Sequence, residues 1–282
     1  MMTDGDVSAP RRAGDFAASV EPLAAQAAIE ELLRAQAEVA ARSGIARFFG
    51  MSPLTPHTHD LYRGVVGEIE VGEALDRLGP EWAVRHTLPV EAGLGDIDHL
   101  VIGPAGVFIV ATKNHSGRNV WASQRTIMVS GVRQPHIRNM EFEMGSAERI
   151  LSAASGSPVR VSGILAVVAA KSLVVREKHR DVAVVPSNQL IAWLLRRTHV
   201  LSPEDVTRLG MAASLSATWS NEHSEDAEPQ RARAQFEALR AEVKRAWRLQ
   251  MAWVVGTTVV GVGAFAGITY AILMSAIDSF GY

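Results

Sequence analysis

Two aspartates and a lysine stand where two apolar stretches of the chain become polar. Asp96 and Asp98 open the run DIDHLVIG, and Lys113 closes the run VFIVATK. Because side chains alternate along a strand, Ala111 and Lys113 share one face of the second strand, as the two aspartates do on the first. Carboxylates can hold a hard divalent cation, and a lysine beside them can offset charge on a phosphate. The spacing alone fits a salt bridge at a strand end equally well.

The elements around these residues predict a mixed α/β domain. The tight connection Gly103-Pro104-Ala105-Gly106 predicts that the two strands are antiparallel neighbours, with Asp98 close to Lys113. Apolar periodicity predicts the order helix, three or more strands, helix, strand. The expected elements are a helix over 67–78, strands over 82–90, 97–102 and 107–111, a hairpin over 120–132, a helix over 140–154, strands over 161–170 and 182–185, and helices beginning at Ser187 and Ser202.

Several motifs in this order resemble the nuclease-related domain family, NERD, of the PD-(D/E)xK nuclease-like superfamily. They begin near Arg63 and extend through Gln134-Pro135, and they are Gly67-Glu68 opening a helix, Gly95-Asp96-Ile97-Asp98-His99, the turn around Gly103-Pro104 and Gly106-Val107-Phe108, Thr112-Lys113-Asn114, and Gly117. The resemblance implies a restriction-endonuclease-like mixed sheet flanked by helices. It also implies hydrolysis of phosphodiester bonds in DNA or RNA with Mg²⁺ or Mn²⁺.

The same resemblance implies roles for individual residues. Asp98 matches the family's sheet aspartate, Glu68 its helix acid and Lys113 its lysine, so all three are expected to be catalytic. Asp98, Glu68 and Asp96 are the expected metal ligands. Ala111 departs from the pattern, because the superfamily has an acidic residue two places before the lysine. Losing that charge and that oxygen should lower the affinity for a hard cation.

Three functions therefore stay open. The first is a metal-dependent nuclease in which Glu68 or Asp96 supplies the missing oxygen, or Asn114 or His115 reaches round to do so. The second is a catalytically impaired module that binds nucleic acid or a protein partner. The third is a membrane-tethered scaffold that associates with itself. His99 points to the other face of its strand and is interpreted as a core histidine.

A stretch without acids follows the first aspartates. No acidic residue lies between Asp98 and Glu141, while basic and aromatic residues recur there. Such residues can neutralise phosphates and stack on bases, although a solvated hairpin would show the same composition. The predicted nucleic-acid contacts are Arg118, Trp121, Arg125, Arg133 and Arg138.

The carboxyl-terminal region predicts one transmembrane helix. Residues 251–277 contain no Asp, Glu, Lys, Arg or His, and the predicted bilayer segment is 249–277. Arginines and lysines precede it, so by the positive-inside tendency the main domain is expected in the cytoplasm of a single-pass cell-membrane protein. Gly263 and Gly267 form a small-xxx-small pair that would allow a homodimer.

Composition and breaks along the chain complete the expected organisation. The 282 residues carry a net charge of −2 and no cysteine, which excludes disulfides and thiolate metal sites. An amphipathic helix is expected over 20–47, and Ser52–Asp60 is interpreted as a linker whose His57 and His59 are solvated rather than metal-bound. The predicted parts are 1–60 (tail, helix and linker), 61–220 (nuclease-related domain), 221–248 (acidic linker and basic helical stalk), 249–277 (span) and 278–282 (short tail).

Overall fold

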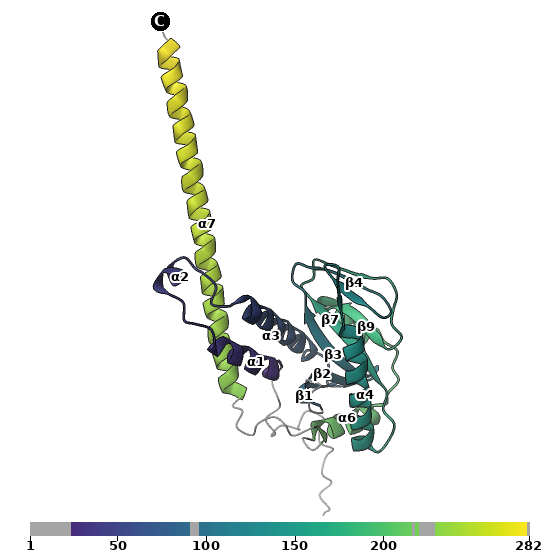
Figure 1. Cartoon of the computed structure of the whole chain (residues 1–282). Coiled ribbons are helices and arrows are strands. Elements are labelled where there is room, and N and C mark those ends of the chain that lie inside the picture. Colours follow the sequence, from purple (N-terminus) through teal and green to yellow (C-terminus); the bar gives the residue numbers. More distant parts are fainter. Residues whose placement is uncertain (1–23, 91–95, 216–217, 220–228, 281–282) are drawn as a thin grey trace, which may run out of the picture. The chain divides into compact units, whose positions relative to one another are not determined.

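The structure is a computed structural model that describes residues 24–90, 96–215, 218–219 and 229–280 (Figure 1). The chain forms two compact units. Unit 1 comprises Met1–Leu32 with Asp60–Gln230, and unit 2 comprises Leu33–His59 with Arg231–Tyr282.

A five-stranded mixed sheet forms the centre of unit 1. Its strand order is β1-β2-β3-β7-β9, and β2 pairs antiparallel with β3 from His99↔Val110 to Gly103↔Gly106, as the tight turn predicts. The pairs β3–β7 and β7–β9 are parallel. The strands are β1 (Ala83–Pro89), β2 (Asp96–Gly103), β3 (Gly106–Asn114), β7 (Val161–Val168) and β9 (Val182–Pro186).

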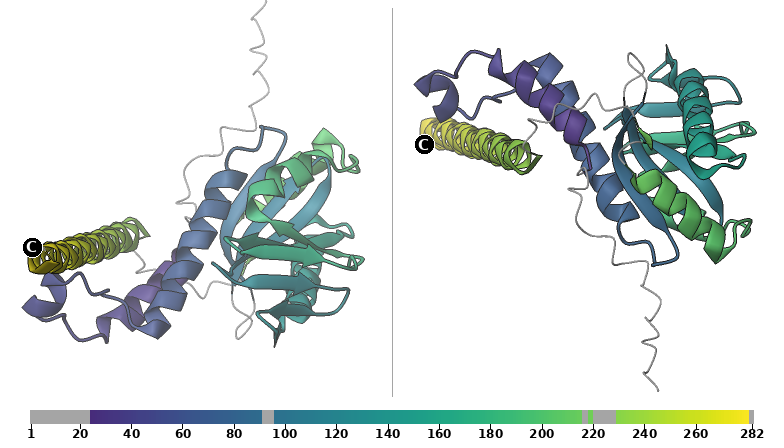
Figure 2. Two further views of the ribbon diagram at one scale, coloured as in Figure 1. Left: turned by 90° about the horizontal axis from the view of Figure 1, so that it is seen from above. Right: turned by 90° about the horizontal axis from the view of Figure 1, so that it is seen from below.

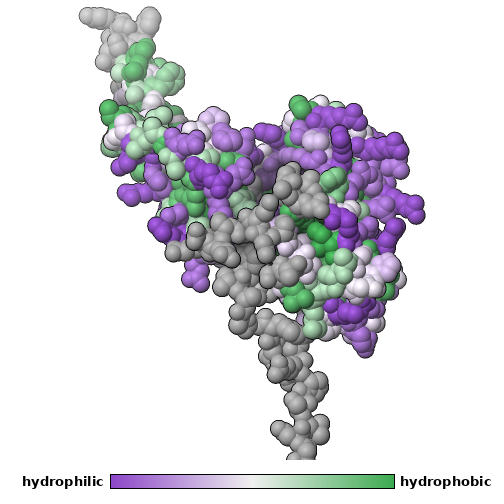
Figure 3. All heavy atoms as spheres, turned by 60° about the horizontal axis from the view of Figure 1, so that its bottom comes forward, coloured by the Kyte–Doolittle hydropathy of each residue, from purple (hydrophilic) through white to green (hydrophobic). Residues whose placement is uncertain are grey.

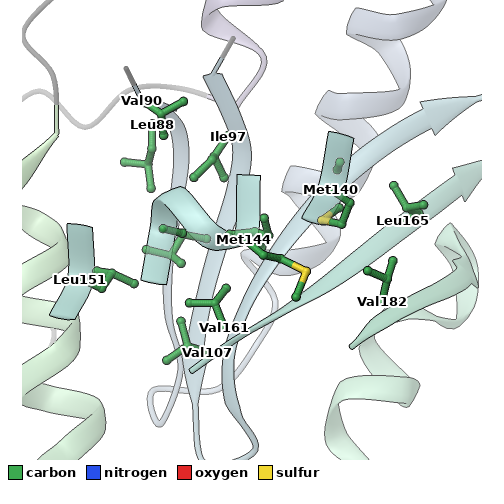
Figure 4. Packing of buried hydrophobic residues seen from close by; sticks show 14 of the residues in the cluster. Leu88, Val90, Ile97, Val107, Met140, Met144, Leu151, Val161, Leu165 and Val182 are labelled. Atoms are coloured by element: carbon green, nitrogen blue, oxygen red, sulfur yellow. The ribbon is translucent and has the colours of Figure 1, made fainter. Parts of the chain in front are cut away.

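Helices cover both faces of this sheet (Figure 2). Helices α3 (Pro56–Leu75) and α5 (Leu190–Leu195) bury apolar residues against one face, together with Val101 and Phe108. Helices α4 (His136–Ser155) and α6 (Pro203–Ser214) cover the other face. Figure 4 shows that second apolar cluster, in which Met140 and Met144 of α4 lie over the sheet. The mixed α/β fold with helices on both sides of a mixed sheet is therefore confirmed.

Two shorter features complete unit 1. A four-stranded sheet has the order β6-β5-β4-β8, from β4 (Asn119–Ala122), β5 (Ile127–Val129), β6 (Val132–Gln134) and β8 (Ser172–Val175). The hairpin expected over 120–132 is β4–β5, whereas β8 was not predicted. A 3-10 turn η1 (Ser187–Gln189) precedes α5, and α6 begins as expected, with Ser202 Oγ accepting from Asp205 N at 3.1 Å.

Two predictions about the amino-terminal region are wrong. Instead of one helix over 20–47, the described part of this range holds α1 (Gln26–Ala37) and a separate α2 (Gly44–Phe48), because Ser43 caps a new helix at Ala46 N. The proposed linker ends at Thr55, since α3 begins at Pro56 and carries His57 and His59 exposed on its first turn. The signal was present, because Thr55 and Thr58 bond reciprocally as a cap and proline is favoured at the first helical position.

Unit 2 contains the long carboxyl-terminal helix. The expected stalk and span form one continuous helix, α7 (Pro229–Phe280), whereas residues 221–228 of the acidic linker lie outside the described residues. Within the described part of the chain, α7 is the one helix long and apolar enough to cross a membrane by length and composition. Its large apolar side chains between Val254 and Leu273 are exposed, and green spheres mark them in Figure 3.

The turn between β2 and β3 gives the first test of this fold. A Cβ at Gly103 would lie closer than 3 Å to ring atoms of Trp82. We expect Gly103→Ala to lower the free energy of unfolding by about 1–3 kcal/mol through overpacking. Denaturant unfolding of the detergent-solubilised protein, followed by circular dichroism, measures this change.

The matched control is Gly64→Ala on α3. A Cβ there meets nothing within 4 Å, so the helix should gain about 0.5–1 kcal/mol. Equal stability of the two alanine variants would contradict the packing described at Gly103.

Candidate functional site

Asp98 is fixed at the point where β2 begins to pair with β3. Its Oδ2 accepts a hydrogen bond from the backbone N–H of Thr112 at 2.7 Å, which joins the two strands just before Lys113. Burial raises the pKa of Asp98, and nearby Asp96 raises it further. The Lys113 ammonium and the Thr112 N–H act in the opposite direction. The predicted proximity of Asp98 and Lys113 is thus observed.

Glu68 reaches the same place from α3, which packs closely on the end of β3. Gly67 allows this approach, because a Cβ there would lie 3.3 Å from Cβ and Nδ2 of Asn114. Asn114 Nδ2 also donates to the backbone oxygen of Arg63 at 2.8 Å. Asn114 therefore holds α3 against β3 rather than turning toward Asp98, so its suggested role as a replacement ligand is not supported by its contacts.

The electrostatics of Glu68 show that the acids lie near one another. Burial raises the pKa of Glu68 well above its usual value, and the charges of Asp98 and, more weakly, Asp96 add to this rise. Lys113 and a hydrogen bond with the backbone of Ala25 lower it. The four residues expected at the site thus lie within electrostatic range of one another, with the positive charge of Lys113 opposing the charges of the acids.

A fourth carboxyl group, Glu143 of α4, was missed by the sequence analysis. Burial raises the pKa of Glu143 to about 7, against the opposing effect of Lys113 and with a further rise from Asp98. Glu143 is therefore in electrostatic range of both principal site residues. The available signal was its position inside the apolar stripe Met140, Met144, Ala147 of a helix expected to cover the sheet.

Ala111 lies on the face of β3 that α4 covers. Its side chain is buried and belongs to the apolar cluster that contains Met140 and Met144. Since Glu143 directly precedes Met144, the helix that fills the space beside Ala111 also carries an acid toward Asp98 and Lys113. Glu143 of the neighbouring helix thus adds a carboxyl group within electrostatic range of Asp98 and Lys113.

Two histidines border the site. The rings of His115 and His136 stack with centroids 5.5 Å apart, and the buried Nε2 atom of each has no hydrogen-bond partner among the residues that the structure describes. Burial, with help from Lys113, lowers the pKa of His136 to about 4, so its imidazole is neutral at pH 7. Burial and the charges of Arg118, Lys113 and Arg63 also lower the pKa of His115.

The five predicted nucleic-acid contacts are exposed, and they lie on the smaller sheet, its loops and the first turn of α4. Of these, Arg118 is in electrostatic range of His115 beside the site. Arg63 was not predicted, yet it also lies near His115 and donates to Ser116 O at 2.7 Å. His99 is fully buried and its Nδ1 lies 2.8 Å from Nδ1 of His86, which confirms its interpretation as a core histidine.

The donors at the site fit a hard divalent cation in their chemistry. Among the described residues, no three His, Asp or Glu side chains converge closely enough to form a complete protein ligand set. Mg²⁺ does not require one, because it is usually bound by one or two carboxylates and completes its octahedron with water and substrate phosphate. Asp98 and Glu68 provide such carboxylates.

Comparison with known families identifies the domain that carries these residues. Residues 63–168 match the family described as the nuclease-related domain, NERD, and this range includes Glu68, Asp98, Lys113 and Glu143. These residues form a NERD domain. The chain is also 42% identical over 60 residues to an uncharacterized protein of Bacillus anthracis, which covers 20% of this chain and 28% of that protein. The compared stretch is thus under a third of that relative. No solved structure matches the chain.

The raised pKa of Glu143 in the NERD domain predicts a pH-dependent stability. Folding moves this pKa from 4.5 to about 7, so between these values the folded state binds more protons than the unfolded state. The free energy of unfolding should therefore fall as pH rises through this window, by at most about 3 kcal/mol from this residue. Glu143→Gln should remove that contribution, as measured by denaturant unfolding at pH 5 and pH 8.

The control is Glu73→Gln, which changes an exposed acid on α3. It should leave the loss of stability between the two pH values unchanged. The same loss in Glu143→Gln as in the unsubstituted protein would mean that Glu143 is not buried among the site carboxyls.

Proposed function

We propose that the NERD domain hydrolyses phosphodiester bonds of nucleic acid with a bound divalent cation, Mg²⁺ or Mn²⁺. The observation that carries this proposal is the concentration of partly buried carboxyl groups from Glu68, Asp98 and Glu143 around the single ammonium of Lys113. Such an excess of buried acid is unfavourable for folding alone. A divalent cation offsets it and supplies what the reaction needs.

In this proposal, each site residue has a separate role. A bound cation would polarise the phosphate and lower the pKa of the attacking water. Asp98 and Glu68 would hold it, with Asp96 beside them, and the Thr112 N–H keeps Asp98 in position. Lys113 is placed to stabilise the negative charge that develops on the phosphate.

Contact with the nucleic acid is proposed for five exposed basic and aromatic residues, of which Arg118 lies in electrostatic range of His115 beside the site. Arg133 Nη2 bonds to Thr126 Oγ1 at 2.8 Å, and the Trp121 side chain is about one third exposed (36%) and so available for stacking. The set is Arg118, Trp121, Arg125, Arg133 and Arg138. The net charge of −2 means that affinity has to come from this local set rather than from the whole chain.

A second function is favoured by one observation, Ala111. In this alternative, the NERD domain has lost turnover and binds nucleic acid or a protein partner. Salt-sensitive binding that survives Asp98→Ala, without cleavage, would support the alternative.

We further propose that α7 anchors the protein in the cell membrane through residues 249–277. The exposed apolar side chains of α7 support this proposal, since water would not favour them. Arg240, Arg245 and Arg248 precede the apolar part, which favours a cytoplasmic NERD domain. Self-association through Gly263 and Gly267 stays a prediction; a Cβ at either glycine meets nothing within 4 Å in the single chain.

A matched pair of variants on α3 tests the nuclease proposal. Glu68→Gln removes one charge from the site, whereas Glu73→Gln removes one from the exposed side of the same helix. Cleavage of labelled DNA and RNA in the presence of Mg²⁺ or Mn²⁺ should fall at least about 100-fold in Glu68→Gln, because the charged groups at the reacting phosphate supply effects of this size. Glu73→Gln should cleave as the unsubstituted protein does.

Calorimetric titration with each cation, on the same proteins, separates the remaining outcomes. Metal binding that is equal in Glu68→Gln and the unsubstituted protein would contradict the role of Glu68. Absence of both metal binding and cleavage in the unsubstituted protein would contradict the nuclease proposal and leave the binding module.

Within this proposal, Glu143 takes the place of the acid that is missing at Ala111. We expect Glu143→Ala to reduce metal-dependent cleavage at least about 100-fold, because a charge next to the reacting phosphate is lost. Moving the acid back to the strand, in the double variant Ala111→Glu with Glu143→Ala, should recover a measurable part of the activity.

Circular dichroism on each variant separates misfolding from loss of chemistry. Full activity in a folded Glu143→Ala would contradict the role of this residue while leaving the nuclease proposal intact.

A further inference from the structure

Unit 2 exposes an unusual group of apolar side chains around the short helix α2. The segment Ile45–Met51, here called the apolar foot, has four large apolar residues that face solvent: Ile45 is 73% exposed, Phe48 60%, Phe49 49% and Met51 59%. Single exposed apolar residues are ordinary, but a contiguous group of this kind marks a contact surface.

The apolar foot is held against one level of α7. Trp253 Nε1 donates to Phe48 O at 2.9 Å, and the Trp253 ring lies 5.0 Å from the ring of Phe48 and 5.4 Å from that of Phe49. Gly50 has φ 70°, and a Cβ there would lie 2.5 Å from Ala246 O and Gln250 N. The backbone of the foot therefore rests directly on α7, while its apolar side chains remain exposed.

This level of α7 is the place where its charges end. Arg248 is the last charged residue before the uncharged stretch 251–277, and Trp253 lies two residues inside that stretch. Tryptophan is enriched at the boundary between lipid and water, where its ring is apolar and its N–H finds a partner. If α7 crosses a bilayer, the foot lies at that boundary.

Basic side chains surround the foot on the side of α7 that carries charge. Arg42, Arg47 and Arg245 line a hollow together with one acid, Glu242. Arg42 forms an ion pair with Glu242 and also donates to Met51 O, so it fixes the end of the foot. Arg47 and Arg245 then add positive charge next to an apolar surface, a combination that suits a bilayer with anionic headgroups.

We propose that the apolar foot is a second membrane contact, which lies in the headgroup and upper acyl region of the bilayer that α7 crosses. Its occupant is lipid: Ile45, Phe48, Phe49 and Met51 contact the acyl boundary, and Arg47 and Arg245 face lipid phosphates. The foot fixes the depth at which α7 lies in the bilayer, because moving its apolar side chains from lipid into water is unfavourable. This inference rests on the proposed membrane span.

The absence of cysteine from the chain allows a direct test. A nitroxide spin label is attached to single cysteines in the full chain, reconstituted in vesicles of phosphatidylcholine and phosphatidylglycerol. The test sites are Ile45→Cys and Met51→Cys, which leave the aromatic residues that contact Trp253 unchanged. The two reference sites are Val260→Cys on α7 and the exposed Phe142→Cys on α4. Power saturation compares collision with oxygen, which enters lipid, and with a water-soluble nickel chelate.

Labels at 45 and 51 should collide more with oxygen than with nickel, as the label at 260 should, and the ratio should reverse at 142. A nickel preference at 45 and 51, with an oxygen preference at 260, overturns the foot and leaves the span. A nickel preference at 260 overturns the span and the foot together. Spin–spin broadening at 45 that persists when the protein is diluted in lipid would show a second copy on this surface, which also overturns the proposal.

Discussion

The hydrogen bond from the backbone N–H of Thr112 to Asp98 Oδ2, 2.7 Å long, is the constraint on which the site of the NERD domain depends. It ties the start of β2 to the end of β3, and it is one of the interactions that keep the partly buried Asp98 ionisable. Another, larger one is the ammonium of Lys113, one residue further along β3. Burial and the charge of Asp96 act in the opposite direction, and the pKa of Asp98 remains raised. The apolar clusters on the two sheet faces must offset this unfavourable arrangement for the domain to fold.

The position of the acids follows from how two helices meet the end of the sheet. On one face, Gly67 and Asn114 allow α3 to approach β3 closely, and this brings Glu68 to the rim. On the other face, Met140 and Met144 pack over the sheet, where a Cβ at Gly163 of β7 would meet both. That close packing places the intervening Glu143 near Asp98. The charge at a site depends on which side chains meet in space, and these can come from different elements. Ala111 of β3 therefore does not by itself leave the site without carboxyl groups.

The sequence was informative wherever a local pattern determines the structure. The tight turn at Gly103 and Gly106 predicted the antiparallel strand pair, and Ser202 with the following proline predicted the start of α6. The sequence did not predict features that depend on contacts between residues far apart in the chain. Strand β8 is short and finds its partner, β4, some 50 residues earlier in the chain, so its four residues carry no signal of their own. The role of Glu143 likewise depends on the packing of α4 on β3, and spacing relative to Asp98 in the sequence could not show it.

In unit 2, the surrounding solvent matters more than any sequence motif. Lipid alone could surround the apolar part of α7 and its Trp253. The backbone of Ile45–Met51 nevertheless lies on α7 at the level of Trp253, and its aromatic side chains are exposed. Phe48 and Phe49, 60% and 49% exposed, belong to a contiguous apolar group of the kind that marks a contact surface. The proposed bilayer would make this arrangement favourable, because the solvent around these side chains would change at this level from water to hydrocarbon. In the proposed membrane-bound state, the apolar foot and the end of charge along α7 at Arg248 mark the same boundary, the first through tertiary packing and the second through composition.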